Sequence, residues 1–256
     1  MNNIFLRQLP IWLAACTMLS CAKQSSPPGT ASLTLFNAVP GSSPSLVTNF
    51  SDTAGPITWY NSALKLTYGG WTTSYQQGSY SGKQPLAIYH IPDTGAHSTP
   101  LFNLMLDLPA GTIHTLFLTG TMSVPDTLFT TDMPPYHPAS DSSMGLRFVN
   151  LSSGSTPVSI NITGGANGSE VNSLPYKGIT GYKNYPATAA VVHYKFEFRD
   201  AATGDSLTSY DITNINTAPA VPNTRRYRNL TLALIGLRGD PVSPQKAILI
   251  DSYTSY

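Results

Sequence analysis

The sequence predicts an all-β protein made of two tandem antiparallel β-sandwich domains. Three observations support this prediction: a stretch that occurs twice, apolar runs of strand length, and turn residues between those runs. The repeated stretch reads LTLFNAVPGSSP from Leu33 and LRFVNLSSGSTP from Leu146, at a constant offset of 113. In both copies an apolar run meets an asparagine and then a turn rich in Gly, Ser and Pro, which is typical of a strand entering a turn. Self-similarity of this kind indicates a duplicated structural unit.

The similarity between the two copies continues along the chain. LTYGGWT at 66–72 matches LPYKGIT at 174–180, TLFLTG at 115–120 matches TLALIG at 231–236, and the last strand of each copy reaches Asp132 or Asp251. The offsets change to 108, 116 and 119, because loops change length while strands keep their order. No helical period longer than one or two turns interrupts the pattern. Each copy is therefore predicted to be a small β-sandwich.

Strand candidates follow from apolar runs and period-two alternation, punctuated by 20 Gly and 21 Pro residues. The first copy has candidates at 32–37, 45–50, 57–60, 63–67, 85–91, 101–108, 113–119 and 127–131, and the second at 146–150, 158–163, 188–199, 206–212, 227–237 and 247–253. The clearest alternation runs from Val192 to Arg199, with Tyr194, Phe196 and Phe198 on its apolar side. It predicts a half-buried antiparallel strand followed by a hairpin turn at 200–205.

Composition limits the classes of partner and the number of domains. The chain has 256 residues, enough for two domains, and 41% hydrophobic residues, enough for a core in each. Only 11% of residues are charged, against roughly 25% in average proteins, and 14 Lys and Arg against 13 Asp and Glu give a net charge of +1. No basic face is indicated, so nucleic acid is not an expected partner. The predicted domains span 31–133 and 143–256, joined by a Pro-rich linker at 134–142.

The N-terminal segment resembles a bacterial lipoprotein signal. After Arg7, an apolar stretch at 9–19 has the length of a secretory signal and is too short to span a bilayer. Met18-Leu19-Ser20-Cys21, followed by a polar AKQSSPP run, resembles a lipobox. The resemblance implies a signal peptide at 1–20, lipidation at Cys21 and a tether at 21–30, so the expected contact with the membrane is a lipid anchor.

A second lipobox match lies at Leu13-Ala14-Ala15-Cys16. Cys21 is preferred, because cleavage before Cys16 leaves a very short apolar core and keeps an apolar pair in the mature chain. Cys16 and Cys21 are the only cysteines, so the predicted domains have no disulfide and no cysteine metal site.

The two copies resemble a known family, the one catalogued as domain of unknown function 4397. The resemblance rests on the paired stretches at 33–44 and 146–157, on Tyr68-Gly69-Gly70, and on Pro109-Ala110-Gly111 before an apolar strand. The second copy departs from it, with Pro222-Asn223-Thr224 near the place of the Pro-Ala-Gly turn. The family implies Ig-like β-sandwiches in cell-envelope proteins and supplies no catalytic residues. Together with the lipobox, it implies an outer-membrane lipoprotein of the Bacteroidota type.

The sequence offers no recognisable catalytic or metal-binding constellation. The five histidines (His90, His97, His114, His137 and His193) lack metal-ligand spacing. The run at 78–82 has Tyr80 where a nucleophile elbow needs serine. Asp200 and Asp205 flank a Gly-containing turn, which favours a plain hairpin over a calcium loop. We therefore expect no enzyme activity, no cofactor and no metal.

One cluster of aromatic residues suggests ligand binding. Interleaved with Gly, Gln and Ser, it comprises Trp59, Tyr60, Trp71, Tyr75 and Tyr80, with Tyr68 beside them. Such residues either fill a sandwich core or form an exposed patch for a glycan or another envelope protein. The sequence leaves both alternatives open and favours the core.

Three functions remain in view at this point. The expected function is a non-enzymatic, lipid-anchored envelope protein that serves binding, adhesion or structural spacing. The first alternative is a glycan-binding accessory protein of a nutrient uptake system. A hydrolase whose site is assembled from distant loops is the least favoured.

Overall fold

The protein is described by a computed structural model, which covers residues 29–51, 59–138, 140–215 and 225–254. Its first half holds strands β1 (Thr30–Asn37), β2 (Leu46–Asn49), β3 (Lys65–Leu66), β4 (Gln76–Tyr80), β5 (Gly82–His90), β6 (Phe102–Leu108), β7 (Ile113–Gly120) and β8 (Pro125–Thr131). Its second half holds β9 (Ser143–Asn150), β10 (Val158–Ile162), β11 (Val171–Leu174), β12 (Lys183–Pro186), β13 (Tyr194–Asp200), β14 (Ser206–Ile212), β15 (Arg228–Ile235) and β16 (Lys246–Thr254). Two 3-10 turns, η2 (Trp59–Asn61) and η3 (Thr73–Tyr75), lie in the first half.

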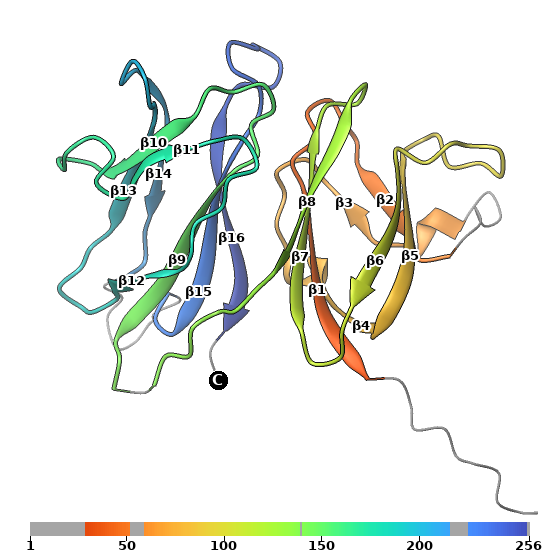
Figure 1. Ribbon diagram of the computed structural model, residues 1–256, viewed down its shortest axis with the longest axis horizontal. Coiled ribbons are helices and arrows are strands. Elements are labelled where there is room, and N and C mark those ends of the chain that lie inside the picture. Colours follow the sequence, from red (N-terminus) through yellow and green to blue (C-terminus); the bar gives the residue numbers. More distant parts are fainter. Residues whose placement is uncertain (1–28, 52–58, 139, 216–224, 255–256) are drawn as a thin grey trace, which may run out of the picture.

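These strands form four four-stranded sheets, two in each half of the chain (Figure 1). The first half has sheets β4-β1-β7-β8 and β3-β2-β5-β6, and the second has β12-β9-β15-β16 and β11-β10-β13-β14. The two strand orders are the same once β9 is equated with β1 and each later strand with its counterpart. This confirms the predicted fold class of tandem, mainly antiparallel β-sandwiches. One pair in each half, β1 with β7 and β9 with β15, is parallel.

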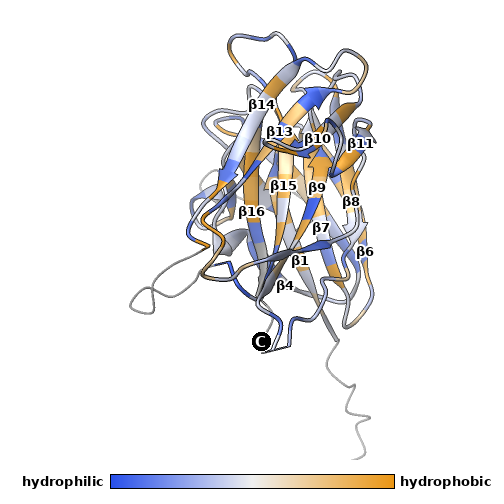
Figure 2. Cartoon of the chain, turned by 90° about the vertical axis from the view of Figure 1, so that its left-hand side faces the viewer, coloured by the Kyte–Doolittle hydropathy of each residue, from blue (hydrophilic) through white to orange (hydrophobic). Residues whose placement is uncertain are grey.

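Each sandwich has its own core between its two sheets. The first core includes Leu35, Leu86 and Phe102, and the second includes Leu146 and Phe196. In Figure 2 the hydrophobic colouring follows β1, β7, β9 and β15 through the middle of the molecule. These central strands have more buried positions than a strand with one face in water.

The repeated asparagine of the sequence is buried in both sandwiches, where its side chain joins separate parts of the backbone by hydrogen bonds. In the first, Asn37 donates through Nδ2 to Ser42 Oγ (2.9 Å) and to the carbonyl of Leu66 (3.0 Å). Its Oδ1 accepts the N–H of Val39 at 3.0 Å. Asn37 is fully buried, so these bonds replace the water that its amide loses on folding. They tie the end of β1 to the following turn and to the end of β3.

Asn150 repeats the same arrangement in the second sandwich. Its Nδ2 donates to Ser155 Oγ and to the carbonyl of Leu174, both at 3.1 Å. Its Oδ1 accepts the N–H of Ser152 at 3.1 Å. In both copies the asparagine therefore hydrogen-bonds to the serine that follows it by five residues in the repeated stretch.

The repeated Tyr-containing turn also has the same geometry twice. The carbonyl of Asn37 accepts the N–H of Gly69, and that of Asn150 accepts the N–H of Lys177. Both turn residues have positive φ, 63° at Gly69 and 62° at Lys177. Glycine adopts this region at little cost, whereas lysine does not. The second copy therefore holds Lys177 in a strained conformation, which a functional or packing contact has to offset.

Several predicted elements differ from the structure. The sequence predicts a strand over 57–60, but Trp59–Asn61 is the 3-10 turn η2, and 57–58 lie outside the described residues. The predicted strand at 188–199 begins only at Tyr194, because its partner β14 ends at Ile212 opposite that residue. Strands β4, β11 and β12 were not predicted. All three lie at sheet edges and are short and half-exposed, so they carry little hydrophobic periodicity.

The two terminal aspartates of the repeat are not equivalent. Thr115 pairs with Thr130 in the first sandwich, and its counterpart Thr231 pairs with Ile250 in the second. Asp132 and Asp251 are therefore offset by one position. A one-residue shift places side chains on opposite faces of a strand, so the two aspartates have different partners.

Candidate functional site

The two sandwiches meet face to face through their central sheets, β4-β1-β7-β8 and β12-β9-β15-β16 (Figure 1). A third hydrophobic cluster joins them, with Phe36 and Phe117 from the first half and Val149, Ala233 and Ile250 from the second. Strand β9 is buried at every position along its length. Its two faces are covered by its own sandwich on one side and by the other sandwich on the opposite side. Near-continuous apolar runs are typical of strands buried in this way.

The same surface of each copy makes this contact. Under the repeat, its members fall into counterpart pairs: Phe36 with Val149, Ala38 with Leu151, Trp71 with Ile179, and Phe117 with Ala233. The contact is therefore that of a pseudo-twofold dimer within one chain.

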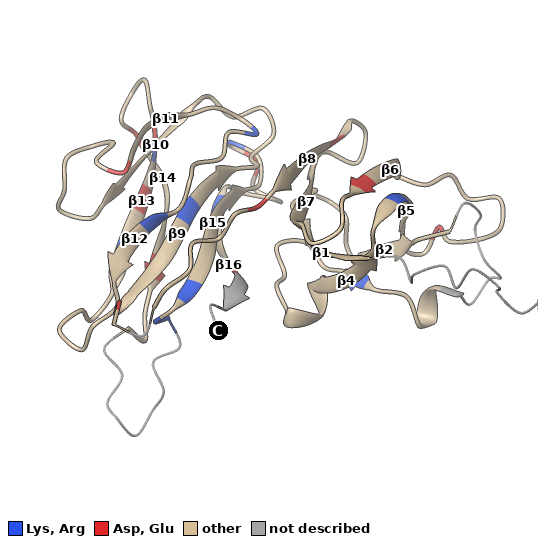
Figure 3. Ribbon diagram, turned by 60° about the horizontal axis from the view of Figure 1, so that its bottom comes forward, with Lys and Arg blue, Asp and Glu red and all other residues tan. Residues whose placement is uncertain are grey.

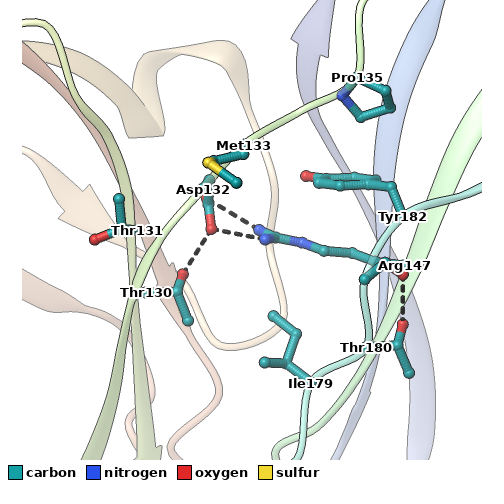
Figure 4. Close-up of a pocket in the computed structure, with 10 residues that line it drawn as sticks. Thr130, Thr131, Asp132, Met133, Pro135, Arg147, Ile179, Thr180 and Tyr182 are labelled. Atoms are coloured by element: carbon teal, nitrogen blue, oxygen red, sulfur yellow. Dashed lines mark hydrogen bonds and ion pairs between the residues drawn. The ribbon is translucent and has the colours of Figure 1, made fainter.

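A buried ion pair lies at the edge of this contact (Figure 4). Arg147 of β9 donates to Asp132 through Nη1 (2.6 Å) and Nη2 (3.0 Å), and through Nε to Thr231 Oγ1 (2.9 Å). Asp132 also accepts from Thr115 Oγ1 (2.5 Å) and Thr130 Oγ1 (2.8 Å). Both charged side chains are almost completely buried. These hydrogen bonds offset part of the free energy that is needed to remove the two charges from water.

The aromatic ring of Tyr182 covers the guanidinium of Arg147, with 4.8 Å between the carbon Cζ and the ring centroid. Burial raises the pKa of Tyr182 to about 12, so its phenol is neutral at physiological pH. Arg147 occupies the position of Thr34 in the first copy. A charge in the middle of an otherwise apolar repeated strand is the sequence signal of this contact.

Two equivalent contacts flank the interface on opposite sides. Tyr176 and Lys177 of the second sandwich reach Asp126 of β8, at 3.3 Å and 2.8 Å. In the first sandwich the counterpart Tyr68 lies under Lys246 of β16, with 4.8 Å from Nζ to the ring centroid. Burial competes with the hydrogen bonds from Lys177, but these bonds hold the pKa of Asp126 below its usual range. The strained Lys177 thus carries an inter-domain ion pair, which explains a lysine where the first copy has glycine.

An opening of about 530 Å³ lies beside the ion pair (Figure 4). Its walls include Met133, Pro135, Ile179, Thr180 and Tyr182, together with the pair itself. Asp132 is its single carboxylate, and that carboxylate is bonded to Arg147 and to threonine hydroxyls. The two charged groups of this opening are hydrogen-bonded to each other, which favours a structural role over acid–base chemistry.

The linker is fixed to the second sandwich by a buried histidine. His137 Nε2 lies 3.0 Å from Asn229 Oδ1, and Asn229 Nδ2 donates to the carbonyl of Pro135 at 2.9 Å. The amide orientation of Asn229 therefore makes Nε2 the donor in its bond to Asn229. On the other side of the ring, Nδ1 lies 3.2 Å from Ser143 Oγ and 3.3 Å from Asp141 Oδ2. These contacts turn a Pro-rich connection into part of the packed structure.

Two other carboxylates, Asp93 and Asp200, are hydrogen-bonded to neighbouring side chains. A shallow loop pocket holds Asp93, His97 and Ser98, but the Ser98 hydroxyl bonds directly to the Asp93 carboxylate, so no histidine stands between them. The carboxylate of Asp200 accepts from Thr156 and Arg238. Among the described residues, no group of three or more His, Cys, Asp or Glu side chains could hold a metal ion.

The aromatic candidates do not form one patch. Tyr75 is buried at 4% exposure, its hydroxyl 3.1 Å from Thr67 Oγ1, so its ring belongs to the first core. Trp71 packs against Tyr75 edge-on and joins both the first core and the inter-domain cluster. Tyr60 packs on the outer face of the sheet containing β2. Trp59 begins η2, and its side chain lies outside what the structure describes.

Tyr80 is different, because it is 66% exposed. It borders a groove of about 590 Å³ beside β4, which Phe50, Gln77, Ser79 and Gln84 also line. Among the members of the predicted aromatic cluster whose side chains are described, Tyr80 is therefore the one beside an open groove.

The predicted lipidation residue Cys21 and the alternative Cys16 lie outside the described residues. Within the described part of the chain, no helix is long and apolar enough to cross a bilayer. Charged side chains are scattered over both halves of the described structure (Figure 3).

Comparison with known proteins gives little further guidance. No protein-family model matches the chain, and no curated protein matches its sequence. Among solved structures, the chain is similar to a crystal structure described as a "putative adhesin" from Bacteroides ovatus, at 11% identity and a TM-score of 0.20. That match covers 85% of this chain and 91% of the other. A TM-score this low carries no argument.

Proposed function

We propose that the chain is a non-enzymatic, lipid-anchored protein of the bacterial cell envelope, in which two β-sandwiches act as one rigid unit for structural spacing and binding. The observation that carries this proposal is the contact between the two central sheets. A hydrophobic cluster and a buried, fully bonded ion pair join the sandwiches, and His137 fixes the linker. Two independently moving domains do not need a contact of this kind.

The lipid anchor and the outer-membrane location rest on the sequence. Cys21 follows an apolar signal-like segment and precedes a polar tether. The described structure begins at Gly29 and enters its first strand at Thr30. A lipid at Cys21 followed by a tether of this length places the first sandwich close to a membrane surface. Membership of the family of domain of unknown function 4397 stays part of the proposal, supported by the duplicated Asn-containing stretch.

Metabolic labelling with radioactive palmitate in a bacterial host tests the anchor. The wild-type protein and the matched control Cys16→Ala should take up label, whereas Cys21→Ala should not. Undiminished labelling of Cys21→Ala would show that the anchor has been assigned to the wrong residue. Loss of label in Cys16→Ala alone would move the anchor to the alternative cysteine.

A second candidate function is glycan binding as an accessory to nutrient uptake. The observation that favours it is the uncharged groove beside β4, with the exposed ring of Tyr80 at its rim. A hydrolase is not favoured, because each of the two acidic side chains found in the openings described above is hydrogen-bonded to its neighbours.

A further inference from the structure

The two sandwiches differ beside β4 and its counterpart β12, where the repeat allows a direct comparison of positions. Ser79 of β4 pairs with Ala31, and Tyr185 of β12 pairs with Met144. Ala31 and Met144 are counterparts at the offset of 113, so Ser79 and Tyr185 occupy the same position in their sandwiches. Cross-strand partners share a face, so both side chains point toward the inside of their sandwich.

The neighbouring strand shows a second difference at the same place. Strands β5 and β13 end at His90 and Asp200, which pair with the first residues of β2 and β10. Gln84 lies six residues before His90, and Tyr194 lies six residues before Asp200. Gln84 is therefore the counterpart of Tyr194. Both residues again face the inside of their sandwich.

In the second sandwich these positions are filled by aromatic rings. Tyr185 packs edge-on against Tyr194 and Phe196, each with 5.5 Å between ring centroids. The Tyr185 hydroxyl donates to Glu170, and the Tyr194 hydroxyl donates to the carbonyl of Pro186 at 2.9 Å. Tyr185 is 3% exposed, so this end of the second sandwich is closed by its own side chains.

In the first sandwich the same place is open. Ser79 and Gln84 replace the two tyrosines, and a groove of about 590 Å³ remains, with Leu33 of the core among its walls. Phe50 and Tyr80, 37% and 66% exposed, stand at its rim. The groove thus lies where the second sandwich has two phenol rings, and its volume falls in the range of small-molecule sites.

The residues that line the groove favour one class of ligand. None of the residues lining the groove is charged. The side-chain N–H groups of Gln77 and Gln84 donate to the carbonyls of Ser74 and Ser81, at 3.4 and 3.3 Å, which leaves their amide oxygens to accept from a ligand. Amide oxygens and hydroxyls above an apolar wall, flanked by exposed rings, suit an uncharged ring that carries many hydroxyl groups. An aromatic peptide side chain would leave these polar groups without partners.

We propose that the groove beside β4 binds the pyranose ring of a neutral glycan, with Tyr80 as stacking platform and the Gln77 and Gln84 amides as hydrogen-bonding groups. This inference rests on the binding part of the proposed function and names its ligand. The second sandwich has closed the equivalent site, so binding is confined to the first.

The test is protein-observed NMR on the full 15N-labelled chain, titrated with maltose, cellobiose, lactose and mannobiose. Glucuronic acid serves as a charged sugar and N-acetyltyrosinamide as an aromatic amide. At least one neutral disaccharide should give saturable shifts at residues 77–84. The variant Ser79→Tyr/Gln84→Tyr, which copies the closed arrangement of the second sandwich, should fold and lose those shifts.

Two single variants resolve the role of the ring. Tyr80→Ala should weaken binding by about tenfold, as expected for loss of one stacking contact. Tyr136→Ala removes a tyrosine of similar exposure, 70%, that does not line the groove, and should bind as wild type does.

Shifts confined to residues that do not line the groove, or shifts that persist in Ser79→Tyr/Gln84→Tyr, would overturn the site. Stronger binding of N-acetyltyrosinamide or glucuronic acid than of every neutral sugar would overturn the ligand class. Absence of saturable shifts with all probes would overturn both. None of these results changes palmitate labelling at Cys21, so failure of this inference is separable from failure of the proposed anchor.

Discussion

Buried polar side chains determine how each copy of the repeat is held together. Asn37 and Asn150 look like ordinary turn residues in the sequence, yet both are completely buried. Each binds a following hydroxyl, a following N–H and a distant carbonyl. An aspartate at either place could not donate to the carbonyl or the hydroxyl, which explains an amide in both copies.

Replacing one of these amides should destabilise its sandwich. In Asn37→Ala, the carbonyl of Leu66 and the N–H of Val39 lose their bonds to the amide, while the hydroxyl of Ser42 keeps its bond to the carbonyl of Val39. We expect a loss of about 2–4 kcal/mol in the free energy of unfolding, because buried unsatisfied groups keep their full desolvation cost. Urea denaturation followed by circular dichroism measures it. The control Asn103→Ala, at an exposed position of β6, should change stability by less than about 0.5 kcal/mol.

The ion pair between the sandwiches should show strong coupling. Arg147→Met leaves Asp132 buried without its counter-charge and should cost about 3–5 kcal/mol. Asp132→Leu leaves the guanidinium of Arg147 buried without its counter-charge and should cost a similar amount. The double variant should recover most of the loss, because it leaves no unpaired charge in the contact. Additive losses in this double-mutant cycle, measured by urea denaturation, would contradict a direct interaction.

At the scale of elements, the sequence predicts strands with a packed face and misses strands at edges. The strand at 206–212 is confirmed at both ends as β14. The alternation predicted from Val192 is confirmed in the burial of Phe196 and Phe198 and is wrong at Val192, which is 62% exposed and precedes β13. The edge strands β4 (QQGSY) and β12 (KNYP) have one hydrogen-bonded neighbour each and no regular apolar face. Their position depends on partners far along the chain, which local pattern does not encode.

The interface was missed for a related reason. Apolar runs such as LTLALI in β15 indicate burial on both faces, but they do not say what covers the second face. The groove beside β4 was only partly predictable. Its rim residue Tyr80 was a candidate, whereas Ser79 and Gln84 became informative only when strand pairing made them counterparts of Tyr185 and Tyr194.

The outer sheet of the second sandwich should respond to acid. On β13, hydrogen bonds from Arg199, Asn161 and Thr163 lower the pKa of Glu197 from 4.5 to about 2. A carboxylate with a depressed folded pKa stabilises the fold above its unfolded pKa and loses this effect as pH falls toward the folded value. Stability should therefore decrease between pH 4.5 and 2, and Glu197→Gln should reduce that decrease while lowering stability at pH 7.

Urea midpoints at pH 7 and pH 3 measure this effect. The matched control is Asp107→Asn, an exposed carboxylate on β6 of the first sandwich, which should keep the wild-type pH response. An equal pH response in Glu197→Gln and wild type would show that other groups dominate acid sensitivity.

At the scale of the whole molecule, the contact between the sandwiches should not depend on the covalent connection. A protease recognition sequence inserted between Pro138 and Asp141 separates His137 from Asp141 and Ser143 but lies outside its bond to Asn229. After cleavage, the two halves should elute together in size-exclusion chromatography. Introducing Ala233→Glu places a charge in the apolar contact and should separate the cleaved halves. Separation of the unmodified halves would show that the linker alone holds them together.

The counterpart pairs across the contact, Phe36 with Val149 and Phe117 with Ala233, have a consequence for assembly. A self-complementary face that meets its own duplicate closes at two units and cannot propagate into a filament. Because both units lie on one polypeptide, their local concentration is fixed by the chain and is independent of how many copies the cell makes. Dilution would reverse such an association between separate chains, whereas it leaves this pairing within one chain intact.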